Sequence, residues 1–411
     1  MTFNSENLSI VFDLGTTEIK GAVMKNDGTL VQKVTQQNYT TVTDSNRHEQ
    51  DAIFWWKAIC SVSNELCESH KIHSVIVTGQ MQNLLLLNTK GSPLQEVILY
   101  SDQRSIEESE WLLQNSCYLD LVAKTGNEQG PTSLLAKLLW IKKHQPEIFS
   151  KTDCLLPGAS DYVVFRMTGE KATDTTTAST TGLMELVERK WIDEALFNKM
   201  GLQGVQTLLP KLFDGGAKIG ELQKKAATDL GIPAGLPVFL GPGDAGSATI
   251  GAGCGVPGKA YAYIGTSGWV AFAEKQPADP TTGVITLSHP KCDHFIQVAP
   301  LLTAGGNLEW AKSLSNFESY DSLINDAISS PLSNLIFLPY LKGERSPFID
   351  PKARGAFIGL QSTTKQSAMN RAVLEGICFA FRHALTALTD THVNELILTG
   401  GGTRSKAFCQ M

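Results

Sequence analysis

Two stretches of the sequence decide the fold: FDLGTTEIKGAV at residues 12–23 and YIGTSGWVAF at residues 263–272. Each contains an apolar strand, a turn that begins Gly-Thr, and a second strand. The two turns lie about 250 residues apart, each near the start of one half of the chain, which indicates a weak internal duplication. The duplication predicts two similar lobes that face each other across a cleft and bring both turns to one ligand.

Segments around these stretches predict an α/β architecture, because strand-like and helix-like patterns alternate. Strands are expected at Leu8–Asp13, Ile19–Met24, Thr29–Val34 and Ser74–Gly79, and the first three form an antiparallel meander. Helices are expected at Ala52–Cys67, with Ile53, Trp56, Ile59 and Leu66 on one side, and at Ser133–His144, whose pattern looks amphipathic. The Pro- and Gly-rich region Pro233–Pro242 marks the boundary between an N-terminal domain (1–243) and a C-terminal domain (244–411).

The composition is that of a globular protein with two or three domains, at roughly 100–200 residues per domain. Of the 411 residues, 42% are hydrophobic and 18% are charged, and the net charge is -6. This charge argues against nucleic acid as a main partner, because binding phosphate backbones requires a basic face. Small anionic ligands stay open, since backbone N–H groups and a metal ion can hold them.

The sequence favours a cytoplasmic protein. The eight cysteines include no C-x-x-C pair, so we expect reduced thiols and no structural zinc site. Met1–Ser9 lacks the profile of a signal peptide. No apolar run approaches the ~20 residues that span a bilayer, so no membrane partner is expected.

The two turns have the chemistry of phosphate-binding loops. They consist of Gly15, Thr16 and Thr17, and of Gly265, Thr266, Ser267 and Gly268. Glycine lets a phosphate approach the backbone N–H groups, and the hydroxyls add further donors. Either turn alone would favour a structural hairpin, whereas the matched pair favours a nucleotide.

Carboxylates and glycines at strand ends are the other candidates. Asp13 ends the first strand, where it can either bind phosphate-bound Mg²⁺ or stabilise the turn. Asp244 ends the strand of VFLGPGD, where it can act as a general base or cap the helix that follows. Glu395–Gly402 (ELILTGGG) runs into three glycines, which suit either a flat ligand or a strand-to-helix connection.

Other patterns point away from a site. Gly241, Gly243 and Gly246 match the dinucleotide fingerprint in form, but no acidic residue follows at the required distance. The Walker motif is absent from the sequence. His48 is expected in a solvated loop, and Thr173–Thr181 in a connecting loop or capped turn. Trp55 and Trp56 are expected in the core.

The sequence resembles the FGGY carbohydrate kinases, and among them the xylulokinases, from Ile10 to Met411. The family motifs are similar to DLGTTEIKGAV (13–23), IGTSG (264–268), GAFIGL…MNRAVLEG (355–376, with Ala368 in place of an acid or amide) and GGGTRS (400–405). The xylulokinase features resemble HEQD (48–51), GQMQN (79–83), YSDQR (100–104), KLLW (137–140) and LPYLKGERSP (338–347).

The resemblance implies two actin-like (ribonuclease H-like) domains around a central cleft, and an enzyme that phosphorylates D-xylulose to D-xylulose 5-phosphate with ATP and Mg²⁺. It implies that Asp244 is the general base and that the sugar contacts are Met81, Gln82 and Asp102. The implied ATP contacts are Gly15, Thr16, Thr17, Lys20, Gly265, Thr266, Ser267, Gly401, Gly402 and Ser405. Asp13 is the implied metal ligand. A homodimer is also compatible with the resemblance.

Besides Ala368, the sequence departs from the family in three places. Gln82 stands where xylulokinases have His, and Ala245 where Asn is usual, and both changes fall on the expected sugar site. The chain ends at Met411, where family members continue, so we expect an incomplete second domain. These departures leave two alternatives open: a kinase for another ketose, polyol or sugar acid, and an inactive protein that senses sugar or nucleotide. An actin- or chaperone-type ATPase shares the phosphate chemistry but would lack the sugar contacts.

Overall fold

The computed structural model describes residues 7–44, 46–67, 70–291, 293–332, 334–350, 352–389 and 393–411. The chain forms two compact units. The first comprises Met1–Ala248 with Leu287–Cys292, and the second comprises Thr249–Thr286 with Asp293–Met411. The expected functional division at 243/244 stays a prediction. Most of the predicted N-terminal segment Met1–Ser9, together with Cys292, lies outside the described residues.

The main sheet of the first unit has the strand order β14-β15-β6-β1-β2-β3. Its strands are β1 (Leu8–Leu14), β2 (Glu18–Lys25), β3 (Leu30–Gln37), β6 (Ile72–Gly79), β14 (Ala217–Glu221) and β15 (Pro237–Leu240). β1, β2 and β3 are antiparallel, and β6 and β15 run parallel to β1. The predicted meander is therefore confirmed, although its third strand continues to Gln37.

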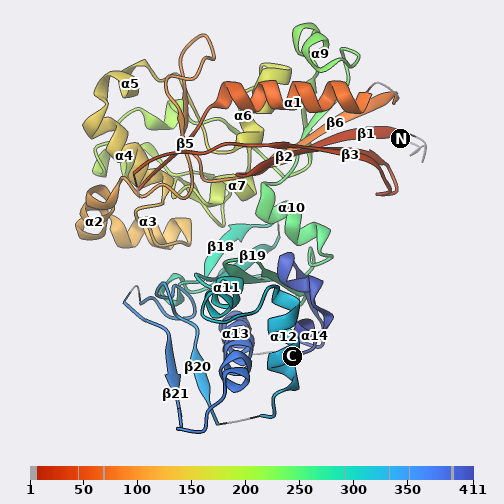
Figure 1. Cartoon of the computed structure of the whole chain (residues 1–411). Coiled ribbons are helices and arrows are strands. Elements are labelled where there is room, and N and C mark those ends of the chain that lie inside the picture. Colours follow the sequence, from red (N-terminus) through yellow and green to blue (C-terminus); the bar gives the residue numbers. More distant parts are fainter. Residues whose placement is uncertain are drawn as a thin grey trace. The chain divides into compact units, whose positions relative to one another are not determined.

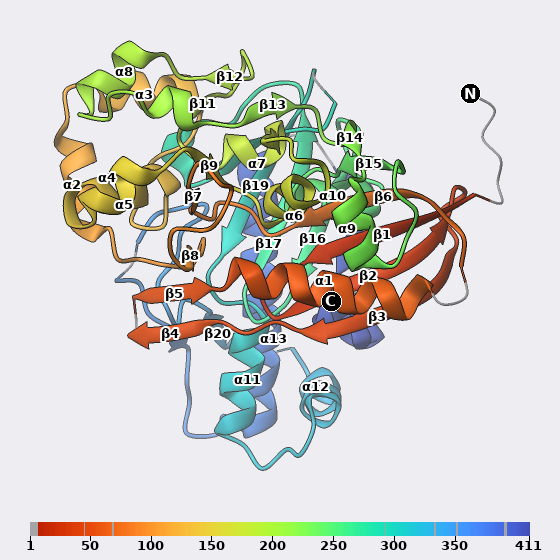
Figure 2. The same ribbon diagram turned by 90° about the horizontal axis from the view of Figure 1, so that it is seen from above.

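Two helices pack on this sheet, α1 (Ala52–Cys67) and α6 (Ala159–Thr168), and α9 (Lys224–Leu230) packs against both of them. α1 lies on β1, β2 and β3 (Figures 1 and 2). The absence of a side chain at Gly21 lets α1 approach β2 closely, because a Cβ there would lie 2.3 Å from Val62. The predicted bounds of α1 and the burial of Trp55 and Trp56 are confirmed. Ile53, predicted on the buried side, is 46% exposed, because Trp55 lies on that side of the helix instead.

A second core of the first unit lies beside the main sheet, built from helices and short strands. Elements of this part of the unit are β7 (Leu85–Leu87), β8 (Val97–Ile98), β9 (Cys154–Leu156), β11 (Met184–Glu185), β12 (Lys190–Trp191), α2 (Ile106–Gln114), α3 (Tyr118–Thr125), α4 (Leu134–His144), α5 (Pro146–Lys151), α8 (Glu194–Lys199) and the 3-10 turn Val205–Leu208. The strands β4 (Thr41–Asp44) and β5 (Arg47–Gln50) join β8 in a small sheet. α4 was expected to be amphipathic, but neighbouring elements enclose it and bury Leu134–Ile141. Even Lys137 is buried; its Nζ donates to the Leu99 carbonyl at 2.6 Å, and burial lowers its pKa to about 7.

The segment predicted as a connecting loop, Thr173–Thr181, is largely ordered and buried. It contributes to β10 (Ala172–Asp174), which pairs with β13 (Lys211–Phe213), and it forms the short helix α7 (Thr175–Ser179). The Asp174 side chain caps α7 by accepting from the N–H groups of Thr176 and Thr177. The capped turn is therefore correct, and the loop is not. His48 lies in β5 and not in a solvated loop, with its Nδ1 2.8 Å from the Ser101 hydroxyl.

The second unit repeats the meander. Its sheet has the order β18-β19-β17-β16-β22, and its strands are β16 (Ala260–Ile264), β17 (Gly268–Glu274), β18 (Ile285–Ser288), β19 (Phe295–Leu301) and β22 (Leu396–Thr399). β16, β17 and β19 are antiparallel, and β22 runs parallel to β16, as β6 does to β1 in the first unit. The duplication inferred from two short stretches thus extends to the strand order of both sheets.

Helices pack on this second sheet around one core. The remaining elements of this unit are α11 (Gly305–Ser313), α12 (Tyr320–Ser329), α13 (Gln366–Leu388), α14 (Lys406–Cys409), β20 (Ile336–Leu338), β21 (Ala356–Ile358) and the 3-10 turns Pro280–Thr282 and Gly401–Arg404. The helix α10 (Asp244–Gly251) begins in the first unit and ends in the second. α13 contacts β17, β19, α11 and α12 and is the central helix of this unit (Figure 1).

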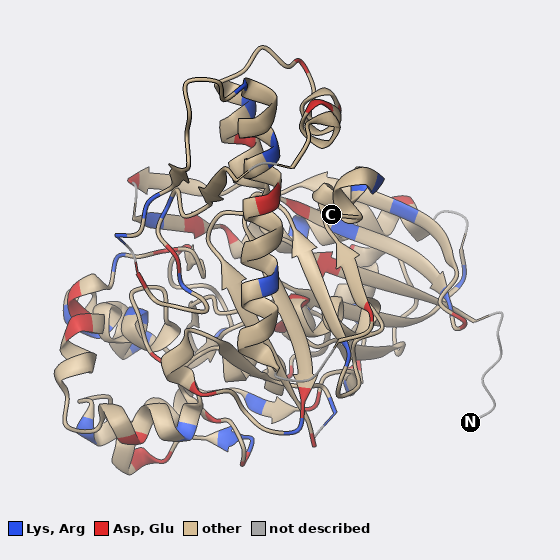
Figure 3. Ribbon diagram, turned by 90° about the horizontal axis from the view of Figure 1, so that it is seen from below, with Lys and Arg blue, Asp and Glu red and all other residues tan. Residues whose placement is uncertain are grey.

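Charged residues of both signs are interspersed along each unit (Figure 3). Among the helices of the described residues, none is long and apolar enough to cross a membrane. The cysteines that the structure describes are free thiols.

Candidate active site

Three segments of the first unit meet at the carboxyl ends of neighbouring parallel strands. The Gly15 turn follows β1, Gln80–Gln82 follow β6, and Gly241–Asp244 follow β15. The Gln80 N–H donates to the Leu14 carbonyl at 2.9 Å, and the Gly241 N–H donates to the Val77 carbonyl at 2.8 Å. Ligands of open α/β sheets bind outside such carboxyl ends, so this edge is the candidate site.

The turn after β1 presents N–H groups, whereas its carbonyl groups are occupied. The Gly15 carbonyl accepts from Asn38 Nδ2 at 2.9 Å, and the Thr16 carbonyl accepts from Gln50 Nε2 at 2.7 Å. The Thr17 carbonyl accepts from the Asn38 N–H at 2.8 Å. Within the described residues, the N–H groups of Thr16 and Thr17 make no hydrogen bond. A turn with its carbonyls satisfied and its N–H groups available is suited to an anion.

The turn after β16 in the second unit has the same arrangement by different means. The Gly265 carbonyl accepts from the Gly305 N–H at 2.8 Å, and the Thr266 carbonyl accepts from the N–H groups of Ala304 and Gly306, each at 2.9 Å. Thr266 and Ser267 are exposed, and within the described part of the chain their N–H and hydroxyl groups make no hydrogen bond. The start of α11 therefore orients this second turn.

Asp13 lies at the end of β1, opposite Lys20 on β2. Its carboxylate is 3.9 Å from Lys20 Nζ, and both side chains are partly exposed. Burial raises the pKa of Asp13, while Lys20 and Lys33 oppose that shift. An ion pair this open to solvent contributes little to the stability of the fold, so both charged groups are available to a ligand.

Asp244 opens α10, and its Oδ1 accepts from the Ala245 N–H at 2.7 Å. Asp244 is thus the first residue of the helix, and its predicted role as a base stays a prediction. Solvent reaches Asp244, so its hydration is only partly lost. Loss of hydration and the charges of Asp13 and Asp174 raise the pKa of Asp244 to about 7, although the hydrogen bond from the Ala245 N–H lowers it. A carboxyl group with such a pKa can exchange a proton near neutral pH.

The backbone before Asp244 is held at several points. The Pro242 carbonyl accepts from the hydroxyls of Thr78 and Ser247, each at 2.6 Å. The Gly243 N–H donates to the buried carboxylate of Asp174. A Cβ at Gly243 would lie 2.0 Å from Met81 Sδ. The glycines that mimic a dinucleotide fingerprint thus serve close packing, as Gly246 does against Pro242.

Two of the three predicted sugar contacts, Met81 and Gln82, follow β6 directly, and Met81 reaches the residue before Asp244. Met81 packs against Gly243. Gln82 has φ 60°, a left-handed conformation that is rare outside glycine and often found at functional sites. Within the described residues, the Gln82 amide makes no hydrogen bond, so all its donors and acceptors are available.

The third predicted sugar contact, Asp102, is fully buried in a network of the chain's own donors. Its Oδ1 accepts from the Arg104 N–H and Nε, and its Oδ2 accepts from Arg104 Nη2 and the His48 N–H at 2.8 Å each. Arg104 also pairs with Glu49 at 2.6 Å. Both oxygens of the Asp102 carboxylate therefore accept hydrogen bonds from the chain itself, and its predicted contact with sugar stays a prediction.

In the second unit, the three glycines after β22 have different surroundings. Gly400 has φ 91°, and a Cβ at Gly402 would lie 2.4 Å from Ile264. A Cβ at Gly401 would meet nothing within 4 Å, so this glycine alone leaves open space for a ligand. Ser405 caps α14 by accepting from the Phe408 N–H at 3.3 Å. The segment predicted to bind the nucleoside of ATP, residues 400–405, therefore has two glycines that packing or backbone conformation requires and one, Gly401, with open space beside it.

The predicted Mg²⁺ fits the carboxylates that the chain provides. No group of three or more His, Cys, Asp or Glu among the described residues forms a cage for a metal ion. Magnesium does not need one, because it binds through one or two carboxylates together with waters and substrate phosphates. The charge of Asp13 raises the pKa of Asp244, and a cation held by Asp13 would oppose that rise.

Sequence reasoning missed three groups of residues. Gln50, Asn38 and Gln80 hold the first turn, Gly305 and Gly306 hold the second, and Asp174 holds Gly243. Polar residues in a strand or a helix start resemble surface residues in sequence. The available signals were the stretches HEQD (48–51) and GQMQN (79–83), which contain Gln50 and Gln80, and the Gly-Gly pair at residues 305–306.

Comparisons with known proteins agree with this geometry. Residues 8–251 match the N-terminal domain, and residues 260–411 the C-terminal domain, of the FGGY family of carbohydrate kinases. The chain is 32% identical over 415 residues to a xylulose kinase of Escherichia coli (strain K12), covering 98% of this chain and 83% of that protein.

Solved structures give the same picture for the fold. A ligand-bound xylulose kinase from Lactobacillus acidophilus matches with a TM-score of 0.90 and 28% identity, over 98% of this chain and 83% of that one. A gluconate kinase from the same organism matches as well, with a TM-score of 0.89, 28% identity and the same coverage.

Two α/β units with matching strand order and a Gly-Thr turn after the first strand define a two-domain kinase fold of the actin-like class. The chain belongs to the FGGY family of carbohydrate kinases. It is therefore a sugar kinase, which transfers a phosphoryl group from ATP to a sugar hydroxyl.

Proposed function

We propose that the sugar substrate is D-xylulose, that the product is D-xylulose 5-phosphate, and that Asp244 is the general base. The observation that carries the assignment of the base is its place after β15, directly behind Gly243, which packs against Met81. β15 pairs with β6, and β6 pairs with β1, which leads into the Gly15 turn. Similarity to xylulose kinases over 98% of the chain supports the choice of sugar.

In the proposed reaction, the sugar hydroxyl oxygen attacks the γ-phosphorus of ATP. The bond between that phosphorus and the bridging oxygen breaks, ADP leaves, and the hydroxyl proton passes to Asp244. Because phosphoryl transfer needs little covalent chemistry from the protein, positioning and charge neutralisation supply most of the rate. Mg²⁺, which Asp13 would help to hold, neutralises phosphate charge when it is bound.

The remaining proposed contacts follow from the available donors. Gly15, Thr16, Thr17 and Lys20 in the first unit, and Gly265, Thr266 and Ser267 in the second, are assigned to the phosphates of ATP. Gly401, Gly402 and Ser405 are assigned to the nucleoside. Gln82 is assigned to the sugar because its free amide can both donate and accept. Asp102 is assigned an indirect role, since its carboxylate already has four donors.

A second candidate substrate is a sugar acid such as gluconate. The gluconate kinase from Lactobacillus acidophilus is as similar in sequence and fold as the xylulose kinase from the same organism. Gln82 and Ala245 also change two groups on the proposed sugar site, and the loss or gain of one polar contact alters sugar preference by orders of magnitude.

The test is a coupled assay of ADP release with D-xylulose, D-gluconate, glycerol and no sugar. We expect D-xylulose to give the highest kcat/KM. Asp244→Asn should lower kcat by at least about 10²-fold with ATP binding retained, since a general base typically contributes 10²–10⁴-fold. Asp120→Asn, at an exposed position on α3, is the matched control and should leave kcat unchanged.

The other outcomes separate the alternatives. Preference for gluconate would replace the substrate, ADP release without sugar would indicate an ATPase, and binding without turnover would indicate a sensor. Near-normal turnover by Asp244→Asn would exclude this residue as the base.

A further inference from the structure

The Gln50 side chain is the centre of a buried amide cluster beneath the first turn. It is 1% exposed and lies at the end of β5. Its Oε1 accepts from Asn38 Nδ2 at 3.2 Å, Trp55 Nε1 at 2.9 Å and Gln80 Nε2 at 2.8 Å. Its Nε2 donates to the Thr16 carbonyl at 2.7 Å and to Thr40 Oγ1 at 2.9 Å. Both hydrogens and the oxygen of this amide are therefore in use.

These bonds set the direction of the turn. With the Thr16 carbonyl bound to Gln50 and the Gly15 carbonyl bound to Asn38, the free N–H groups of Thr16 and Thr17 are left available for an anion. In the second unit, backbone N–H groups at the start of α11 bind the carbonyls of the turn. The first turn depends on side chains instead, so a substitution can remove the support without moving a helix.

The same amide joins the turn to the loop proposed to bind the sugar. Gln80 donates to Gln50 through Nε2 and accepts from Thr16 Oγ1 at 3.1 Å through Oε1. Met81 and Gln82 follow Gln80 directly in the chain. Gln50 thus contacts, within one hydrogen bond, both the turn that would hold phosphate and the residue that precedes the sugar contacts.

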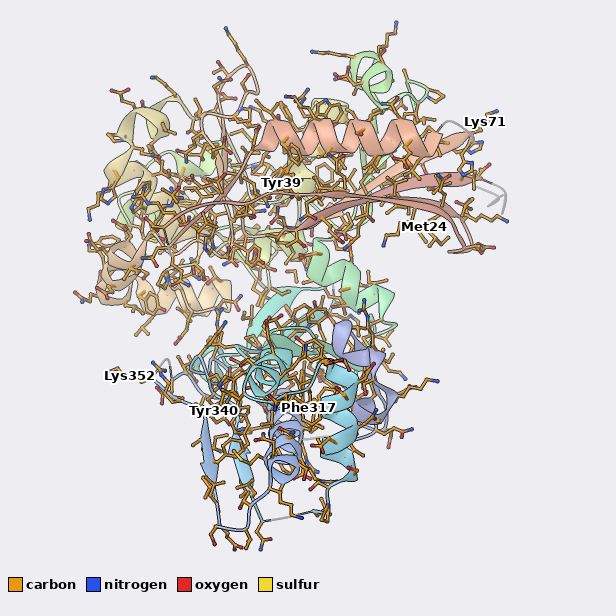
Figure 4. All side chains as sticks on the ribbon, viewed as in Figure 1. Met24, Tyr39, Lys71, Phe317, Tyr340 and Lys352 are labelled. Atoms are coloured by element: carbon orange, nitrogen blue, oxygen red, sulfur yellow. The ribbon has the colours of Figure 1, made fainter. Side chains whose placement is uncertain are left out.

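The cluster is enclosed by rigid elements. Trp55 lies in the first turns of α1 and is fully buried. Tyr39, between Asn38 and Thr40, lies beside α1 (Figure 4) and meets Phe54 edge-on at 5.9 Å. A fully satisfied buried polar cluster of this kind specifies one geometry, because every broken bond leaves a buried group unpaired.

We propose that Gln50 is a positioning residue for phosphoryl transfer, which fixes the Gly15–Glu18 turn relative to the sugar loop Gln80–Gln82. The inference rests on the kinase reaction proposed above. It assigns to Gln50 an effect on kcat, through the alignment of γ-phosphate and hydroxyl, beyond any effect on folding. Misplacement by about 1 Å can reduce the rate about 10²-fold.

The test uses Gln50→Glu, which keeps the shape of the side chain and whose ionised carboxylate keeps the acceptors but cannot donate to the Thr16 carbonyl. Isothermal titration with D-xylulose gives the fraction of folded sites, and steady-state kinetics give kcat per folded site. We expect kcat per site to fall about 10²-fold, with a D-xylulose stoichiometry near that of the wild type. Gln129→Glu is the matched control, because Gln129 is also buried but bonds to the Asn127 carbonyl. It should retain the wild-type kcat per site.

Each other outcome contradicts a different statement. A wild-type kcat per site in Gln50→Glu, or a loss that only follows the loss of sites, would overturn the positioning role. A wild-type enzyme without turnover on any sugar would instead overturn the proposed function. Should Gln50→Glu not fold, Thr40→Val removes one partner of Gln50 at a half-buried position. Its kcat should fall about threefold to tenfold, and an unchanged kcat would overturn the inference.

Discussion

Asp244 shows how the surroundings of one residue create a reactive group. An aspartate on an ordinary surface is a weak base at neutral pH, because it holds its proton only under acidic conditions. Partial loss of hydration and two neighbouring carboxylates raise the pKa of Asp244 to about 7. A base with a pKa near the working pH binds a proton strongly, while a large fraction of it is still unprotonated and able to accept one.

A prediction about pH follows at this scale. Below pH 7 the raised pKa leaves Asp244 protonated, so kcat/KM should fall about tenfold for each pH unit, with an apparent pKa near 7. The acidic limb of kcat should lie at lower pH, because a cation bound at Asp13 opposes the charge that raises the pKa. Rate profiles between pH 5 and 9 test this. A kcat/KM that stays constant down to pH 5 would contradict the assignment.

At the scale of elements, each unit orients its turn with a different neighbour. In the first unit the turn is held by side chains from β5, α1 and the segment after β3. In the second unit the start of α11 donates three backbone N–H groups to the carbonyls of Gly265 and Thr266. Gly305 allows this approach, since a Cβ there would lie 2.5 Å from the Gly265 carbonyl oxygen.

Gly305→Ala should therefore disturb the second turn. Backbone must move to admit the methyl group, at a cost of about 1–3 kcal/mol. We expect the KM for ATP to rise about tenfold or more, with the KM for D-xylulose within about twofold, because the proposed sugar contacts lie in the first unit. Gly251→Ala, on the exposed end of α10 with no atom within 4 Å of the new Cβ, is the control. Equal changes in both KM values would argue against this division of roles.

At the scale of the whole molecule, two units of one topology carry different proposed ligands. Both sheets contain an antiparallel meander with a parallel strand beside it. The surroundings have diverged: the first unit adds a second core of helices, and the second adds the central helix α13. Fold alone does not assign a ligand, so the assignment depends on the groups at each sheet edge.

Hydrogen exchange should resolve the two ligands. D-xylulose should slow exchange most at residues 79–83 and 241–245, and Mg·ADP most at residues 264–268 and 400–405. Binding lowers the population of locally open states at the contacted segment beyond any global stabilisation. Exchange followed by mass spectrometry with each ligand alone checks this. Strongest protection by D-xylulose at residues 264–268 would contradict the assignment.

Much of the architecture could be predicted from local patterns. The meander, α1 and β6 follow from apolar periodicity and turn residues, and the duplication follows from two Gly-Thr turns. The errors have one cause, which is tertiary enclosure. α4 has the pattern of an amphipathic helix but is buried nearly all round, and His48 and Thr173–Thr181 are polar yet lie in ordered elements.

The sequence by itself determined the α/β class, the repeated meander, the family, and the candidate residues at the strand ends, because these depend on periodicity and on short motifs. Only the tertiary structure decided which candidates present free groups. It enclosed Asp102 in four hydrogen bonds, left Gln82 and Gly401 open, and raised the pKa of Asp244. It also placed Gln50 beneath the first turn, since hydrogen-bond partners 30 or more residues apart meet only when strands and helices have packed.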